Sequence, residues 1–342
     1  MIVKNEARHL ADCVASVSRL ADEICVVDTG STDGTVELAA SLGCRVGHFA
    51  WCDDFAAARN ASLTLCTGDW IFALDADERI AQEDHPRIRA LLNGPRDAAY
   101  RVTTRNYTDN AGQSGFIACV PDDPYAEGFA GWFPSVKVRL LPNGLGAHFE
   151  GPVHELINPS LERAGVRLLE CDVPVHHYGL ARDASALAEK HALYLRLGQA
   201  KVLAEPENPK AHAELGNQYV EMGAYAQAVA AYREALRLAP KSAELLKDLG
   251  GVLHLMGRAP EAERALRLAV EIDPGHVEAW RNLGVVLAGV GHWAEAEACF
   301  SRALAHAPGH EELTRYAALM REKLGLAGEM AADAPGKKEE HR

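Results

Sequence analysis

A strict 34-residue period in the second half of the chain limits its fold more than any other feature. Small residues recur at this interval, and they let the two helices of a hairpin pack closely. Larger side chains recur between them at Tyr232, Leu266 and Phe300 and would fill the space between hairpins. The other recurring positions are Pro206, Pro240, Pro274 and Pro308; Leu215-Gly216, Leu249-Gly250 and Leu283-Gly284; Gly223, Gly257 and Gly291; Ala228, Ala262 and Ala296; and Ala235, Ala269 and Ala303. Because proline ends a helix, this pattern predicts stacked helical hairpins.

This periodic pattern resembles tetratricopeptide repeats, with one repeat each over 209–242, 243–276 and 277–310. We expect a capping helix over 311–325, a linking helix over 181–208 and a disordered charged tail over 326–342. Such stacks present a concave face that binds peptides or proteins. The alternative is a scaffold that dimerises the chain or packs on its first half.

A short apolar segment followed at once by acidic residues is the main chemical signal of the first half. Residues 67–74 are too few for an amphipathic helix and predict a buried strand, after which come Asp75, Asp77 and Glu78. Crowded carboxylates resist ionising together, and a divalent cation removes that conflict. The plainer alternative is that Asp75 caps a following helix while the other two are solvated.

Two segments before this strand predict a nucleotide-binding arrangement. Met1 to Val3 is expected to be a strand that is short on its N-terminal side, with residues 4–6 at its carboxyl edge. A second strand over 23–28 leads into a turn of small residues, 29–35, and then a helix. The turn is neither G-x-G-x-x-G nor a Walker loop. Asp28 could bind a ribose or a base; alternatively Asp33 caps the helix and the rest is turn chemistry.

A third strand over 45–49 precedes an alanine-rich helix that Asp53 or Asp54 would cap. Arg59 lies about two turns into this helix. Its guanidinium could reach a diphosphate or a nearby carboxylate, and an ordinary surface arginine is the alternative.

Four segments taken together, MIVKNE, VVDTGSTDGT, DDFAAARN and GDWIFALDADE, resemble glycosyltransferase family 2 in order and spacing. The resemblance is strongest to the branch with lipopolysaccharide-core glucosyltransferases and peptide S-glycosyltransferases. It implies an α/β GT-A domain over 1–180, a Rossmann-like nucleotide-diphospho-sugar transferase fold that precedes the all-α solenoid. It also implies a nucleoside-diphosphate-sugar donor, a divalent metal and inversion at the anomeric carbon.

The resemblance also assigns roles by motif. Asp75 and Asp77 would be the D-x-D pair, with Asp77 the more direct metal ligand, and Arg59 would face the nucleotide. The remaining predicted donor-binding residues are Lys4, Asn5, Glu6, Asp28, Ser31 and Asp33.

Two later motifs complete the predicted site. FEGPVHE, residues 149–155, is similar to a family segment at the active-site face; Glu155 is the first candidate for the catalytic base and His154 the second. The alternative is that this pair braces a turn. VPVHHYG, residues 173–179, resembles the family's closing L-H-Y-G motif, so His177 would complete the metal shell and His176 would be structural. An imidazole ligand favours Mn²⁺ over Ca²⁺, with Mg²⁺ as the alternative metal.

The region between the D-x-D pair and these motifs is predicted to hold a helix over 82–92 and strands over 98–106 and 135–141. The long loop between the strands carries Trp132 and Phe133. It would act as a lid or stack on a sugar, unless it is an inert insertion.

Composition narrows the function further. A net charge of −13 argues against nucleic-acid binding. Eight cysteines without C-x-x-C spacing favour a reducing cytosol. No signal peptide or membrane-spanning segment is predicted, so membrane association would be peripheral, at the inner face.

The leading hypothesis is therefore a metal-dependent inverting transferase that uses a UDP-sugar. Its acceptor would be a peptide, protein or glycan, with the repeats as a docking module for the acceptor or a protein partner and a homodimer as a further expectation. A repeat scaffold with a catalytically retired transferase domain is the alternative. A nucleotidyltransferase would need a glycine-rich basic loop, and residues 4–6 do not provide one.

Overall fold

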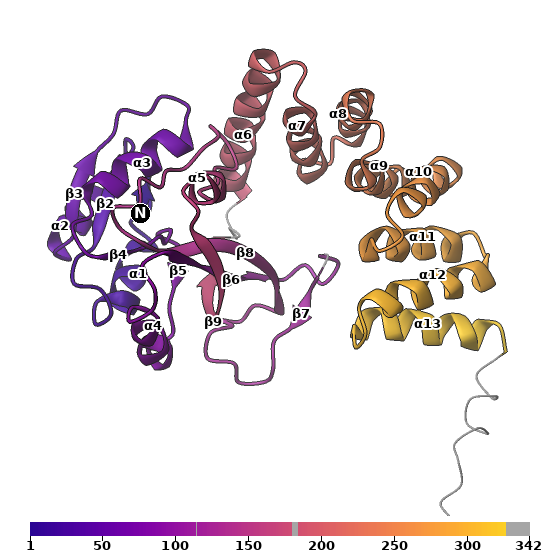
Figure 1. The fold of residues 1–342 in the computed structure, drawn as a ribbon, viewed down its shortest axis with the longest axis horizontal. Coiled ribbons are helices and arrows are strands. Elements are labelled where there is room, and N and C mark those ends of the chain that lie inside the picture. The colour runs from indigo at the N-terminus through magenta and orange to yellow at the C-terminus, as the bar shows by residue number, and fades with distance from the viewer. Residues whose placement is uncertain (114, 180–183, 326–342) are drawn as a thin grey trace, which may run out of the picture. The chain divides into compact units, whose positions relative to one another are not determined.

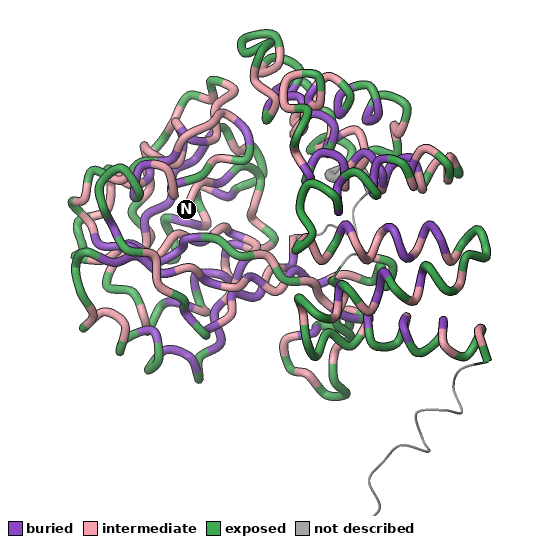
Figure 2. Tube along the Cα trace, turned by 45° about the vertical axis from the view of Figure 1, so that its right-hand side comes forward, coloured by how far each residue is buried: buried purple, intermediate pink, exposed green. Residues whose placement is uncertain are grey.

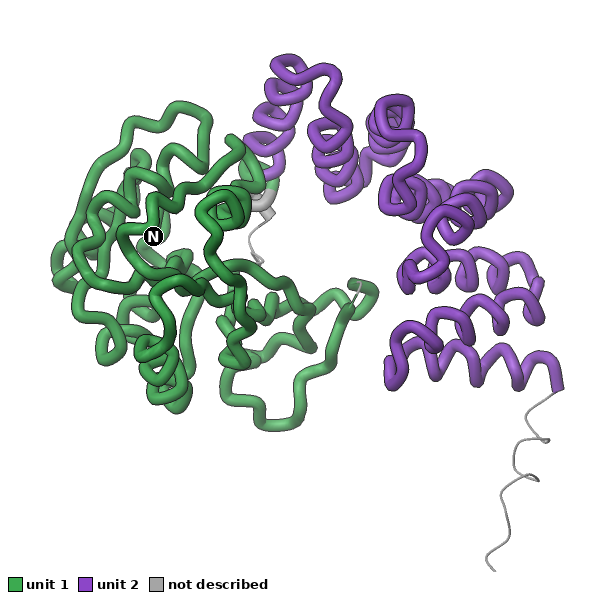
Figure 3. Tube along the Cα trace, in the orientation of Figure 1, with its two compact units in different colours: residues 1–190 green, residues 191–342 purple. Residues whose placement is uncertain are grey.

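The computed structural model describes residues 1–113, 115–179 and 184–325 (Figure 1). The chain divides into two compact units, Met1–Lys190 and His191–Arg342, which Figure 3 shows in separate colours. The predicted disordered tail over 326–342 and residues 181–183 of the predicted linking helix lie outside the described residues.

The first unit begins with a three-stranded parallel sheet of order β1-β2-β3. Val3 on β1 and His48 on β3 both pair with Asp28 at the end of β2, so the carboxyl ends of the three strands meet at one edge. Helices follow each strand, as the sequence predicted. The elements are β1 (Ile2–Val3), α1 (Leu10–Val17), β2 (Cys25–Asp28), α2 (Thr35–Ser41), β3 (Arg45–His48) and α3 (Phe55–Leu65).

A second, mixed sheet of order β4-β8-β6-β9-β5 forms the rest of this unit, with β7 paired to β8. β4 and β6 run antiparallel to β8, and β6 runs parallel to β9. β5 pairs with β9 so that Glu78 lies opposite His177. This pairing brings the acidic segment beside the closing histidine motif. The strands are β4 (Trp70–Phe72), β5 (Glu78–Arg79), β6 (Ala98–Thr108), β7 (Ile117–Ala118), β8 (Gly131–Pro142) and β9 (Arg167–His177).

Several predicted elements differ in extent from the observed ones. The helix expected over 82–92 is a 3₁₀ turn, η1 (Gln82–Asp84), followed by α4 (His85–Leu91). The loop expected between the strands is shorter, because β6 and β8 extend further and β7 adds to the sheet. A further helix, α5 (Asn158–Arg163), was not predicted. No helix follows Asp75, where a turn leads directly into β5, so the prediction that Asp75 caps a helix is wrong.

Buried apolar residues gather on both sheets of the first unit and along the inner faces of the helices (Figure 2). The second unit has a core of its own, built from the residues that recur with the 34-residue period. Gly216, Gly250 and Gly284 face Tyr232, Leu266 and Phe300, so the expected close approach of paired helices is confirmed. The helices are α6 (Ala184–Ala204), α7 (Pro209–Glu221), α8 (Tyr225–Leu238), α9 (Ala243–Leu255), α10 (Ala259–Ile272), α11 (Val277–Gly289), α12 (Trp293–His306) and α13 (Glu311–Lys323).

The predicted linking helix is α6, and its second half packs as the first layer of the solenoid. Gly198 stands one period before Tyr232, at the position that the other repeats fill with a large side chain. The side chain of Gln218 lies against this glycine, and Lys201 pairs with Glu214 at 2.6 Å. The 34-residue spacing therefore extends into the second half of α6.

Candidate active site

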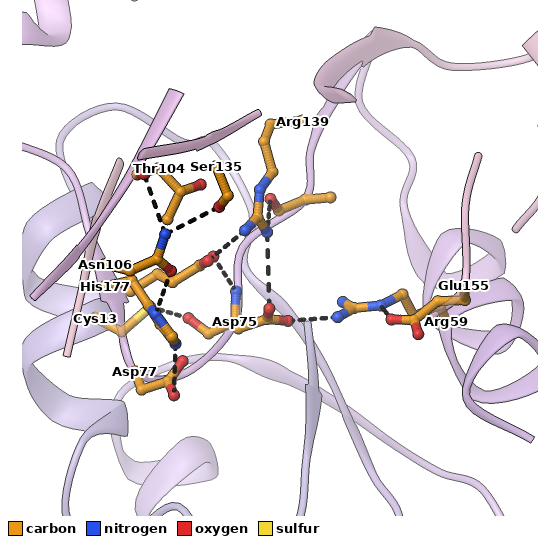
Figure 4. A network of polar contacts seen from close by, with 12 residues as sticks. Cys13, Arg59, Asp75, Asp77, Thr104, Asn106, Ser135, Arg139, Glu155 and His177 are labelled. Atoms are coloured by element: carbon orange, nitrogen blue, oxygen red, sulfur yellow. Dashed lines mark hydrogen bonds and ion pairs between the residues drawn. The ribbon is translucent and has the colours of Figure 1, made fainter. Parts of the chain in front are cut away.

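Asp75 lies between two arginines just after β4 (Figure 4). Its Oδ1 is 2.8 Å from Arg59 Nη2, and its Oδ2 is 3.8 Å from Arg139 Nη1. Burial raises the pKa of Asp75, but the charges of Arg59 and Arg139 outweigh it and the net pKa is lowered. Asp75 is therefore held as a carboxylate by paired cations.

Glu78 is built into the protein interior and is not solvated as the plainer alternative predicted. It is 1 % exposed, pairs with Arg139, and accepts the backbone N–H of Asp75 at 2.9 Å. Burial raises the pKa of Glu78, and the neighbouring charge of Arg139 offsets part of this effect. Arg139 itself is 3 % exposed and comes from the middle of β8. Our sequence analysis gave it no role; an arginine followed directly by the apolar residues Leu140 and Leu141 was the available signal.

Asp77 faces the other way from Asp75, toward β9. Its Oδ2 is 3.3 Å from Nε2 of His177, because β5 pairs with β9 (Figure 4). Burial by itself raises the pKa of Asp77, but the hydrogen bond from His177 has the larger opposite effect, so the net pKa is lowered. Burial by itself lowers the pKa of His177, but the hydrogen bond to Asp77 has the larger opposite effect, so the net pKa is raised. Each group therefore stabilises the charged form of the other.

Gly179 packs directly against this pair. A Cβ at this position would lie 1.7 Å from Asp77 Oδ2 and 2.8 Å from His177 Nε2. Any side chain here would displace both groups, so the close approach at this position of the H-Y-G segment requires glycine.

Asp77 and His177 together fit a small divalent cation. One carboxylate and one imidazole suit Mn²⁺ or Mg²⁺, which also take oxygens from phosphate and water. Among the residues that the structure describes, there is no group of three or more His, Cys, Asp or Glu that could hold a metal. A bound ion would therefore have at most two protein ligands here, Asp77 and His177, and would depend on a phosphate-bearing ligand.

The predicted donor-binding residues meet at the edge of the parallel sheet. Asp28 is buried and accepts the backbone N–H groups of Gly30 and Ser31, both at 3.0 Å. The side-chain Oδ1 of Asn5 accepts the backbone N–H of Thr32 at 2.8 Å, and the backbone N–H of Asn5 donates to Ser31 Oγ at 2.9 Å. A hollow of about 290 Å³ opens at this point; it is lined by Asp28, Ser31, Thr32, Gly34, Thr35, Val36, Glu37 and His48.

The other predicted donor residues hold or flank this hollow. Asp33 accepts the backbone N–H groups of Ala7 and Thr35, both at 3.1 Å, and so ties β1's loop to the turn before α2. Lys4 is exposed beside them. Burial and the charges of Asp77 and Asp75 raise the pKa of Glu6 to about 7. Glu6 thus lies close enough to Asp75 and Asp77 for their negative charges to raise its pKa.

Arg59 connects the D-x-D pair to the FEGPVHE segment. Its Nε donates to Oε1 of Glu155 at 2.5 Å, across 96 positions of sequence. Asn60 reinforces the connection, because its amide exchanges hydrogen bonds of 2.9 and 2.7 Å with the backbone of Phe149. Burial by itself lowers the pKa of Arg59, but the charges of Asp75 and Glu155 have the larger opposite effect, so the net pKa is raised. The prediction of an ordinary surface arginine is therefore wrong. The other candidate base, His154, is exposed, with a left-handed φ of 53°.

The segment predicted as a lid is anchored to the domain. Tyr125 donates through its hydroxyl to Glu83 at 2.7 Å, and its carbonyl accepts from the Tyr178 hydroxyl at 2.9 Å. Arg79 lies 4.4 Å from the centre of the Tyr178 ring and pairs with Glu127. Trp132 is half-buried against this cluster. These contacts fix the segment beside β9.

Comparison with known families identifies both units. Residues 1–143 match the model of glycosyl transferase family 2, and residues 216–257 and 253–322 match two tetratricopeptide-repeat models. The chain carries a family 2 glycosyltransferase domain followed by tetratricopeptide repeats. The predicted fold class, an α/β transferase domain and an all-α solenoid, is confirmed.

Curated relatives match the chain in part. A TPR repeat-containing protein of Synechococcus elongatus is 37% identical over 189 residues, 54% of this chain and 42% of the relative. An uncharacterized glycosyltransferase of Rickettsia bellii is 37% identical over 105 residues, 30% and 35% of the two chains. Glycosyltransferase SunS of the SPbeta prophage in Bacillus subtilis is 28% identical over 218 residues, 61% and 46%. The chain spans less than half the length of each.

Among solved structures, the crystal structure of MamA protein matches with a TM-score of 0.40 and 22% identity, over 43% of this chain and 81% of that one. No helix in the described part of the chain is long and apolar enough to cross a membrane.

Proposed function

We propose that the transferase domain moves a sugar from a nucleoside-diphosphate sugar, with UDP as the favoured nucleotide, to an acceptor, and that a divalent ion assists. The observation that carries this proposal is the pair of Asp77 Oδ2 and His177 Nε2, which lie 3.3 Å apart with Gly179 packed against them. Asp75, which the two arginines hold ionised, stands two residues away. The hollow beside Asp28 would take the nucleoside.

Asp77 and His177 would hold the ion, Mn²⁺ or Mg²⁺, which when bound offsets negative charge on the departing diphosphate. The remaining steps belong to the chain's own residues. Asp75 is oriented to accept hydrogen bonds from donor hydroxyls, since Arg59 and Arg139 fix its carboxylate. Arg59 also supplies positive charge beside the diphosphate.

We assign the role of general base to Glu155, with His154 as the second candidate. In the inverting reaction the acceptor atom bonds to the anomeric carbon while the bond from that carbon to the diphosphate oxygen breaks. The acceptor's proton would pass to Glu155. Because Glu155 Oε1 already accepts from Arg59, the proton would go to the other carboxylate oxygen. Glu155→Gln should abolish transfer, and His154→Asn should do so instead if the second candidate is the base.

The repeats are proposed to dock a peptide or protein acceptor, or a partner that presents one. Support comes from the stack itself, in which α9 contacts α11 and the first helices of successive hairpins line up. A glycan acceptor remains the second proposal, because the residues proposed for the chemistry all belong to the first unit.

The test is a donor screen with purified chain and Mn²⁺, in which slow hydrolysis of the correct sugar nucleotide is measured. Asp77→Ala should lower the rate by roughly 10²-fold or more. Asp69→Ala is the matched control, because this acid precedes β4 and its side chain is 81% exposed. Equal hydrolysis by the wild type and Asp77→Ala would remove the proposed role of this pair.

The alternative is a repeat scaffold with a retired transferase domain. Calorimetry with UDP, with and without Mn²⁺, separates the two cases. A working site should release metal-dependent heat that Asp77→Ala abolishes. A retired site should give none with any nucleotide.

A further inference from the structure

Asn106 on β6 contacts His177 from the side opposite Asp77. It is 8% exposed and lies between β8 and β9. Its Oδ1 is 2.9 Å from Nδ1 of His177. Its Nδ2 donates to Ser135 Oγ at 3.0 Å and to the carbonyl of Thr104 at 3.3 Å (Figure 4). It also donates to the carbonyl of Phe133 at 3.0 Å.

These contacts fix which way round the amide of Asn106 stands. Carbonyl oxygens only accept hydrogen bonds, so the group that faces Phe133 and Thr104 must be the amide NH₂. The opposite orientation would place Oδ1 against two carbonyl oxygens inside the sheet. The amide oxygen must therefore face His177.

The orientation of Asn106 in turn fixes the tautomer of His177. Oδ1 can only accept, so Nδ1 of His177 carries the proton. Without a metal ion Nε2 also carries a proton, which it donates to Asp77, and a bound ion would take the place of that proton on Nε2. Metal-binding histidines in proteins commonly have the other ring nitrogen held in this manner.

The neighbouring histidine provides a contrast within the same strand. His176 meets the hydroxyl of Tyr107 at 2.8 Å through Nδ1. A hydroxyl both donates and accepts, so this contact leaves the tautomer of His176 free. Of these two adjacent histidines, only the one beside Asp77 faces a group that can only accept.

We propose that Asn106 is a positioning residue that holds His177 in the Nδ1–H tautomer, with Nε2 presented to a metal ion shared with Asp77. This inference rests on the proposed metal site. Asn106 contacts neither donor nor acceptor in this role and acts through His177 alone.

The test compares Asn106→Ala with Ser135→Ala by calorimetric titration with Mn²⁺ in the presence of UDP. Asn106→Ala should weaken Mn²⁺ binding by about 10- to 100-fold. Ser135→Ala removes one support of the amide but leaves the carbonyls of Phe133 and Thr104, and it should change affinity only a few-fold.

Two further measurements keep the result unambiguous. In a His177→Ala background, Asn106→Ala should cause no additional loss, because its effect passes through the missing ring. Nitrogen NMR of the metal-free chain should show an Nδ1–H at His177 that exchanges slowly with solvent in the wild type, and Asn106→Ala should speed this exchange. This second readout also works with a variant whose stability is reduced but which remains folded.

The outcomes separate this inference from the proposed function. If the wild type binds no Mn²⁺ under any condition, the proposed metal site fails. If the wild type binds Mn²⁺ and Asn106→Ala binds it equally well, the positioning role is overturned while the transferase proposal stands. If Asn106→Ala weakens Mn²⁺ binding as much in the His177→Ala background as in the wild type, the positioning role is likewise overturned.

Discussion

The two units of this chain use their interiors in opposite ways. In the transferase domain, charged side chains such as Glu78 and Arg139 are fully buried against each other. In the described part of the repeats, the buried polar side chains are His212 and Gln218, and the rest of the interior is apolar or small. A solenoid needs only complementary shape, whereas a site for a charged donor needs carboxylates held in place by matching cations.

The largest effect is expected from removing one buried charge. Arg139→Met leaves Glu78 without its cation, and we expect a loss of about 3–5 kcal/mol in the free energy of unfolding. Urea denaturation of the transferase domain measures this loss.

The matched control is the double variant Arg139→Met with Glu78→Gln. The glutamine can still accept the backbone N–H of Asp75 and carries no charge, so much of the lost stability should return. If the single and double variants are equally unstable, the ion pair does not explain the buried charges.

Acid should destabilise the transferase domain through His176. Burial, followed by the charge of Arg105, lowers the pKa of this histidine from 6.5 to about 4. The unfolded chain therefore binds more protons between these values, and the free energy of unfolding falls as the pH drops through them. At about 1.4 kcal/mol per pH unit, the full loss is on the order of 3 kcal/mol.

His176→Gln cannot take up the proton and should flatten this slope. Thermal unfolding of both forms across the same pH range provides the comparison. Identical slopes would show that another group governs the acid response.

The repeats should respond instead to added volume. A Cβ at Gly250 would lie 2.5 Å from Leu266 Cγ, so Gly250→Ala should cost about 1–3 kcal/mol through overpacking. At the next residue, Gly251, a Cβ would have its nearest neighbour 3.9 Å away, at Asn282 Nδ2. Gly251→Ala should therefore stabilise α9 by roughly 0.5–1 kcal/mol.

The opposite signs at adjacent positions are the decisive point, and circular dichroism during urea unfolding measures both. If both alanine variants are less stable than the wild type, the backbone of α9 and not the packing space beside each glycine determines which residues these positions tolerate.

An effect smaller than that of Gly250→Ala is expected from the ion pairs of Lys247 in the repeats. Lys247 lies within 2.7 Å of carboxylate oxygens of Glu244 and Asp248, and 3.5 Å from Glu278 on the next hairpin. Lys247→Met should cost about 1 kcal/mol, because partly exposed pairs are screened by water. Raising the salt concentration should narrow the difference between the two proteins, and a difference that salt leaves unchanged would mean that packing of the side chain matters more than its charge.

The sequence by itself determined the repeat unit almost to the residue. A period of 34 places small residues opposite large ones within each hairpin, and contacts of this kind join residues that are close in the chain. It also located Asp75 and Asp77 after a buried strand, and the closing motif pointed to His177. The repeat contacts follow from local spacing, whereas the roles of Asp75, Asp77 and His177 came from the resemblance of short segments to family motifs.

The tertiary structure decided how those groups are supported. Arg139 and Asn106 were not predicted as site residues, because their partners lie 61 and 71 positions away and meet them only through strand pairing. Arg59 reaches Glu155 across 96 positions for the same reason. Residue types indicate which charges are present, but only the register of the strands determines which of them lie within bonding distance.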